Sequence, residues 1–195
     1  MKEKSNLKIK ENAYIKKSNL KWVITITTWT LFTSVMLAFI SDYIMPKAHI
    51  VAAIAVLFMF ISIGIVFDMV GLAIATANEQ PFHSMGSRKI IGTKQAVSLI
   101  RNAEKASSLC NDVVGDIAGI ISGSTTAAIV LRFAALYGAD SIMLSLIVTG
   151  FVAALTVGGK AMGKAFAISH ANRITYAVAL LWYYIGGFLK KRRAK

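Results

Sequence analysis

The sequence predicts an all-α integral membrane protein with about four transmembrane helices, a cytoplasmic amphipathic helix and a C-terminal interfacial helix. Of its 195 residues, 56% are hydrophobic and only 16% are charged, whereas a soluble domain has about 25% charged residues. The charges gather at the chain ends and between long uncharged runs. The net charge of +13 therefore follows the positive-inside pattern of membrane proteins.

The excess of lysine and arginine indicates contact with lipid head groups. Lysines and arginines flank apolar runs and no basic–aromatic motif accompanies them, so we expect no nucleic-acid partner. The expected partner is a lipid bilayer with anionic head groups on its cytoplasmic side. The single cysteine, Cys110, excludes an intrachain disulfide and argues against a cysteine-based zinc site.

The chain begins with a basic arm at residues 1–21, in which seven lysines oppose two glutamates. This charge keeps the arm in the cytoplasm. Trp22–Ile44 follows as the first span, since about 20 apolar residues cross a bilayer. We expect its threonines to make hydrogen bonds to other helices; they are Thr25, Thr27, Thr28 and Thr30. Met45–His49 is expected as a short outside loop.

The second span, Ile50–Ala77, is interrupted by one charge, Asp68. An acid inside a membrane helix costs about 2.5–3.5 kcal/mol on insertion scales, so it should face the bundle or a wet cavity. Pairing with a cation from another helix and a role in an ion pathway are equally compatible with this position.

The polar stretch Asn78–Cys110 is expected in the cytoplasm because it carries five lysines and arginines. Within it, apolar residues recur at helical spacing between Thr93 and Leu109, with charges opposite. This pattern predicts an amphipathic helix along the inner membrane face.

The third and fourth spans are predicted at Asp112–Tyr137 and Ser141–Gly159. The last apolar run, Ile174–Leu189, would extend only about 24 Å as a helix, so we expect an interfacial or re-entrant helix. The basic tail at residues 190–195 should stay inside. These assignments predict a multi-pass protein of the cell membrane with both termini in the cytoplasm.

Acidic residues and glycines mark the start of the third span. Asp112 and Asp116 lie one helical turn apart, and a second set of glycines flanks the end of the fourth span. Small residues allow helices to approach closely in membranes. The glycines expected to pack are Gly115, Gly119, Gly123, Gly159 and Gly163. The candidate ion pathway comprises Asp68, Asn111, Asp112 and Asp116, with Ser122 and Ser124 as neutral oxygen donors.

Residues 50–189 resemble the transmembrane domain of the CNNM/CorC magnesium-transporter family. Its Ser-Gly-Ser-Glu-like turn, Gly-Asn-Asn start and Gly-Glu-x-x-Pro-Lys end look like three stretches here, which are Phe67–Ala73, Gly115–Ile117 and Gly159–Lys164. The first span is additional to that core. The family's nucleotide-binding regulatory domains have no counterpart in these 195 residues. The resemblance implies that Mg²⁺ is the transported ion. We expect no other cofactor. We also expect the chain to form a homodimer.

The departures from the family pattern concern its Mg²⁺ ligands. The family's serine positions resemble Asp68 and Val70, its asparagines Asp116 and Ile117, and its glutamate Lys160. Mg²⁺ demands a tight octahedron of oxygen ligands, and a lysine would repel it. We expect Lys160 to pair with Asp68 or Asp116, which would close the site and abolish or alter transport.

Two functions follow from these patterns. The first is ion handling by a degenerate relative of the magnesium transporters. The second is a non-transporting membrane interaction or assembly protein that uses its glycine-faced helices. We expect no enzymatic activity, because the three histidines are scattered and neither a nucleophile elbow nor a phosphate loop is present.

Overall fold

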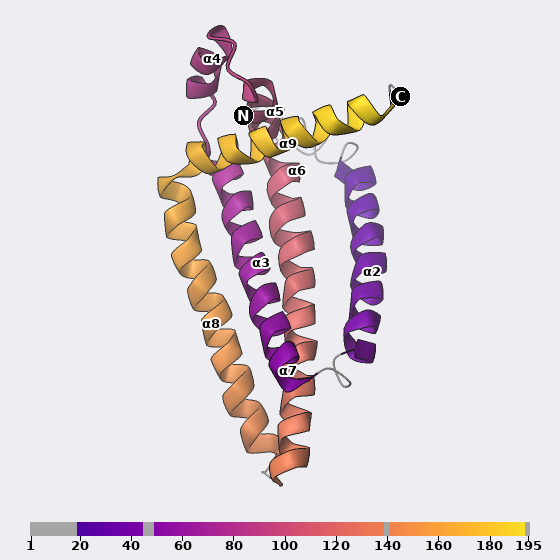
Figure 1. Ribbon diagram of the computed structural model, residues 1–195. Helices are drawn as coiled ribbons and strands as arrows, with labels where there is room; N and C mark the ends of the chain where they lie inside the picture. Colours follow the sequence, from indigo (N-terminus) through magenta and orange to yellow (C-terminus); the bar gives the residue numbers. More distant parts are fainter. Residues whose placement is uncertain (1–18, 45–48, 139–140, 194–195) are drawn as a thin grey trace, which may run out of the picture.

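The computed structural model describes residues 19–44, 49–138 and 141–193, and all elements within these ranges are helical. Four stretches are long and apolar enough to cross a membrane, which agrees with the predicted number: Leu20–Ser41, Ile50–Thr76, Ala103–Leu136 and Ile142–Ser169. They run side by side as an elongated bundle (Figure 1). Residues 1–18 of the predicted arm at 1–21 and residues 45–48 of the predicted loop Met45–His49 lie outside the described ranges.

Helix α3 (Ile50–Thr76) lies at the centre of the bundle, between α7 (Asp116–Tyr137) and α8 (Ser141–Ser169). Helix α2 (Asn19–Ile44) packs mainly on α7, at the opposite side from α8 (Figure 1). The residues of α3 that face its neighbours recur every three or four positions, as one helical stripe requires: Ala53, Leu57, Ile61, Gly64, Asp68 and Gly71. Asp68 is thus part of the packed stripe.

The third long helix begins earlier than predicted and changes its winding. It comprises α6 (Ala103–Ser108), the π-helix η1 (Leu109–Gly115) and α7. The amphipathic helix predicted at Thr93–Leu109 is correct only as far as Arg101, where α5 (Thr93–Arg101) ends. Asn102 breaks it by leaving the helical conformation and donating its side-chain amide to the Ser98 carbonyl.

Helix α8 also exceeds its predicted length. The fourth span was expected to stop at Gly159, but the helix continues for ten more residues to Ser169. The residues after Gly159 are lysine, alanine and methionine, which are good helix formers. The helix therefore continues past Gly158 and Gly159. Lys160 and Lys164 therefore stand on a regular helix beside α3.

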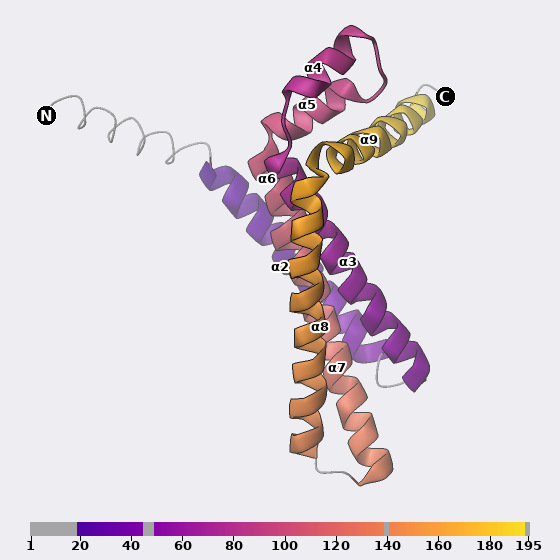
Figure 2. The same ribbon diagram turned by 90° about the vertical axis from the view of Figure 1, so that its left-hand side faces the viewer.

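A smaller helical layer covers one end of the bundle (Figure 2). It contains α4 (Gln80–Ser87), α5 and α9 (Ala171–Arg193). Phe82, Ala96 and Ala179 form its core, one from each helix, and all are at most 2% exposed. We call the end of the bundle that this layer covers the α9 end.

Helix α9 runs crosswise to the long helices (Figure 1), as a helix that does not continue the bundle. Its first half packs against α5 and the residues just before it. Tyr176 donates a hydrogen bond to the Ile91 carbonyl at 3.1 Å, and Leu180 packs on Gly92. Gly92 has a φ of +85°, which glycine adopts without strain. From Leu181 to Gly186 every side chain is exposed, so the second half of α9 presents an apolar and aromatic surface.

Candidate functional site

Asp68 is the charged residue most deeply placed between the long helices. It lies about two turns before the end of α3, and is 7% exposed. Its Oδ2 atom is buried and accepts no hydrogen bond, while Lys164 of α8 brings its Nζ to 3.8 Å. Buried charges require pairing, and the partner here is a lysine of which 55% of the side chain is exposed.

Asn111 faces the same stripe of α3 from the π-helix. Its Oδ1 is buried and has no hydrogen-bond donor. The side chain lies against Gly71, where an added methyl group would overlap Oδ1 and approach the Ser107 carbonyl oxygen to 3.1 Å. Gly71 therefore makes room for the Asn111 amide, one turn along α3 from Asp68.

Lys160 lies on the α8 side of this region. A methyl group added at Gly115 would lie 3.9 Å from its Nζ, so the ammonium group reaches the end of the π-helix. The sequence suggested that Lys160 would pair with Asp68 or Asp116, but the structure pairs Asp68 with Lys164. Lys160 and Lys164 lie one turn apart on α8, and sequence spacing alone does not reveal which of the two meets Asp68.

Asp112 and Asp116 lie on a different face of the third helix. Both are exposed, and they line a groove between that helix and α2. Asp112 accepts a hydrogen bond from Ser108 at 2.7 Å. The four residues expected to form one pathway are therefore divided, with Asp68 and Asn111 at the α3 interface and the other two acids toward α2.

The described side chains do not assemble a cluster of three or more histidine, cysteine, aspartate or glutamate residues suited to a metal ion. The α3 interface offers two buried oxygens without hydrogen bonds, from Asp68 and Asn111, beside two lysines. This interface therefore holds one carboxylate and one amide, and the positive charge beside the carboxylate is the ammonium group of Lys164.

The predicted packing glycines behave in two ways. Gly159 and Gly163 abut Ile65 and Met69 of α3, and Gly115 is buried. Gly119 and Gly123, in contrast, are exposed and have open space where a side chain would be. Each four-residue step drifts by about 40° around an α-helix, which turns the later glycines away from α3.

The threonines of α2 were predicted to donate hydrogen bonds to other helices, but three of them bond within their own helix. Thr25, Thr28 and Thr30 donate to carbonyls four residues earlier in their own helix. A side-chain hydrogen bond between α2 and α7 joins Ser41 and Ser124 at 2.9 Å. A small polar residue in an apolar run was the only sequence signal for Ser41.

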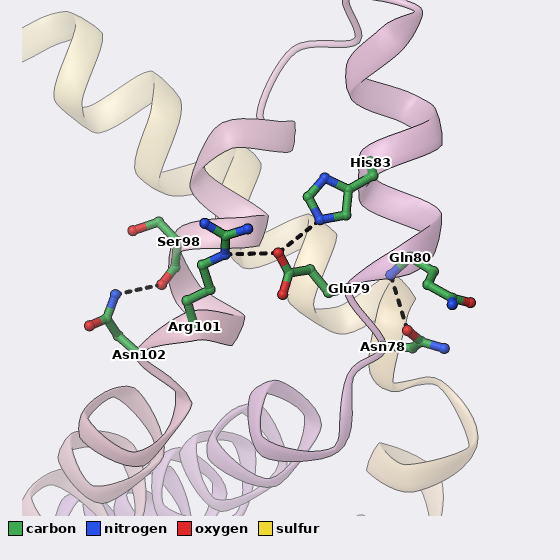
Figure 3. Close-up of polar contacts among 7 residues, drawn as sticks. All are labelled: Asn78, Glu79, Gln80, His83, Ser98, Arg101 and Asn102. Carbon is green, nitrogen blue, oxygen red and sulfur yellow. Dashed lines mark hydrogen bonds and ion pairs between the residues drawn. The ribbon is translucent and has the colours of Figure 1, made fainter.

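A second polar cluster lies at the α9 end (Figure 3). Glu79 accepts from Arg101 and pairs with His83, each at 2.8 Å, and joins the start of α4 to the end of α5. The Arg101 hydrogen bond lowers the pKa of Glu79, desolvation opposes this effect, and His83 reinforces it. This cluster links α4 to α5 through side-chain contacts.

Comparisons with models of known protein families, with curated proteins and with solved structures found no match to this chain.

Proposed function

We propose that the chain is a multi-pass protein of the cell membrane whose residues 50–189 resemble the membrane domain of CNNM/CorC magnesium transporters, with an ion site occupied by the protein's own lysines. Four apolar helices of spanning length support the membrane assignment. The exposed Trp182 and Tyr184 on α9 suit a membrane interface, and the basic tail that follows suits the anionic cytoplasmic surface.

The observation that carries the ion-site proposal is the buried polar contact among α3, η1 and α8. Asp68 and Asn111 each hold a buried oxygen without a hydrogen bond, and oxygen is the ligand that Mg²⁺ requires. Lys164 lies 3.8 Å from the carboxylate. In this proposal the lysines of α8 neutralise the site and oppose the entry of a divalent cation.

The same contacts favour Asn111 as the amide ligand of the site. The sequence resemblance placed the family's asparagine at Asp116, yet Asp116 lines the groove toward α2, while Asn111 lies against Gly71. The π-helix contributes to this difference: its hydrogen bonds join residues five apart, so it shifts the phase of the helix. Such turns occur frequently at functional sites.

Mg²⁺ uptake into proteoliposomes tests the proposal. We expect the natural protein to carry no Mg²⁺ and the double variant Lys160→Glu with Lys164→Gln to gain uptake, because it restores the family's carboxylate and removes the lysine that pairs with Asp68. Lys94→Glu combined with Arg88→Gln is the matched control, since it makes the same charge change at exposed positions of the smaller helical layer and should remain inactive. Uptake by the natural protein would show that the lysines do not close the site. Inactivity of the double variant at Lys160 and Lys164 would refute the ion site and leave the second function.

That second function is a non-transporting assembly protein, and the open glycine face of α7 favours it. Gly119 and Gly123 are exposed with nothing beside them, which would allow close approach of a second copy of the chain. Under this function Gly119→Leu should convert a homodimer to a monomer on gel filtration in mild detergent. Gly150→Leu, at an equally open glycine of α8, should leave the dimer intact; unchanged elution of both variants would refute the idea.

A further inference from the structure

A groove separates α2 from the start of the third long helix. It has a volume of about 480 Å³, which lies within the usual range for small-molecule sites. One wall belongs to α2 and the other to η1 with its flanking turns. The residues that decide its chemistry are Thr30, Leu31, Ser34, Val113, Asp112 and Asp116.

Among the described residues, those that line the groove carry two negative charges and no positive one. Asp112 and Asp116 are both exposed, and among the described residues neither has a lysine or arginine within ion-pair distance. The side-chain donor to Asp112 is the Ser108 hydroxyl at 2.7 Å. Two carboxylates on one wall attract a positively charged group, and the attraction is stronger where apolar surroundings exclude water.

The opposite wall adds a hydrogen-bond acceptor. The Thr30 hydroxyl gives its proton to the Ile26 carbonyl at 2.8 Å, which leaves its lone pairs to accept. Ser34 also lines this wall, but its Oγ has almost no exposed surface and does not contact an occupant. An occupant that donates a hydrogen bond or carries positive charge suits this wall.

The remaining lining is apolar, with Ile26, Leu31, Val35 and Val113 between the polar groups. A bare metal ion would leave most of that surface uncovered. A molecule with an apolar body and one cationic head covers both kinds of lining, because burial of apolar surface adds to the charge attraction.

We propose that this groove binds a lipophilic organic cation, with its positive head at Asp112 and Asp116 and its apolar body against α2. The site is separate from the polar contact at Asp68, which lies on the other side of α7 toward α8. It uses the first long helix, which is additional to the core that resembles the magnesium transporters. Mg²⁺ transport and cation binding can therefore fail independently.

Equilibrium dialysis of the full-length protein in mild detergent tests this inference with two probes of the same shape, the cation tetraphenylphosphonium and the anion tetraphenylborate. Detergent micelles without protein give the background. We expect the cation to bind at least tenfold more tightly than the anion. Equal binding of the two probes, or binding of neither above background, would overturn the proposal, and this comparison does not depend on any variant folding.

Variants then locate the cation. Asp112→Asn combined with Asp116→Asn should weaken tetraphenylphosphonium binding at least tenfold, because the substitutions keep the side-chain shape and remove the charge. Glu104→Gln is the control, since it removes an exposed acid of α6 outside the groove and should leave binding unchanged. Unchanged affinity in the double variant, with normal elution on gel filtration, would show that the cation binds elsewhere.

Discussion

Asp68 and Lys164 form an ion pair whose two ends lie in different surroundings. The carboxylate is buried on α3, whereas the lysine extends from α8 with more than half of its side chain exposed, and the two charges are 3.8 Å apart. The pair stands beside the close contact of Gly163 with Met69. It therefore supplies charge compensation within the contact between α3 and α8, while the lysine itself stays largely exposed.

The close fit of Gly71 against the π-helix leads to a first prediction. Gly71→Ala should lower the stability of the folded protein by about 1–3 kcal/mol, as overpacking does in tight interiors. The Asn111 amide could rotate away, but the Ser107 carbonyl oxygen is backbone and stays 3.1 Å from the new methyl group. Thermal unfolding in detergent measures the effect.

Gly119→Ala is the matched control, since a methyl group there meets open space and alanine favours a helix over glycine by about 1 kcal/mol. It should raise the melting temperature or leave it unchanged. Equal destabilisation by both substitutions would show that the close contact of Gly71 with Asn111 does not decide the outcome.

The orientation in the membrane gives a second prediction. His49, which precedes α3, and Ser87, the last residue of α4, are both exposed. The start of α3 and the helix α4 lie at opposite ends of the bundle (Figure 1), and the positive-inside rule predicts that the α9 end lies in the cytoplasm. Cys110→Ser first removes the native thiol. In that background, a membrane-impermeant maleimide applied to intact cells should label His49→Cys at the outer end and leave Ser87→Cys at the cytoplasmic end unlabelled. After cell lysis both should react. The reverse labelling pattern would invert the topology.

Glu79 gives a pH-dependent prediction. Its pKa is lowered in the folded protein below its ordinary value of 4.5, chiefly by the Arg101 hydrogen bond. The stability that the pair contributes is thus full above pH 4.5 and is lost as pH falls through the lower, folded pKa. Carbon-13 NMR titration of Glu79 should show its midpoint rising in Arg101→Gln. An unchanged midpoint would assign the lowered pKa to another cause.

The sequence predicted the long helices well because their signal is local. Uncharged runs of spanning length identify α2, α3 and α8 from composition alone. The boundaries failed where single residues decide them. Asn102 divides a continuous amphipathic pattern into two helices, and the end of α8 at Ser169 lies ten residues beyond the predicted end at Gly159.

The site was less predictable because it depends on how helices face one another. Lys160 and Lys164 are one turn apart on the same helix, and only the packing of α8 on α3 brings the later one to Asp68. The π-helix was invisible to a search based on the α-helical period, yet Asn111 and Asp112 both lie within it. A regular period therefore grouped residues that the structure directs to different neighbours.

Lys164, and not Lys160, neutralises the buried carboxylate of Asp68, and a double-mutant cycle on the free energy of unfolding measures this pairing. Asp68→Asn and Lys164→Gln should couple by about 0.5–3 kcal/mol, as contacting residues do, whereas Asp68→Asn and Lys160→Gln should be additive within about 0.5 kcal/mol. Additivity of the Lys164 pair, or strong coupling of the Lys160 pair, would contradict the arrangement on which the proposed ion site depends.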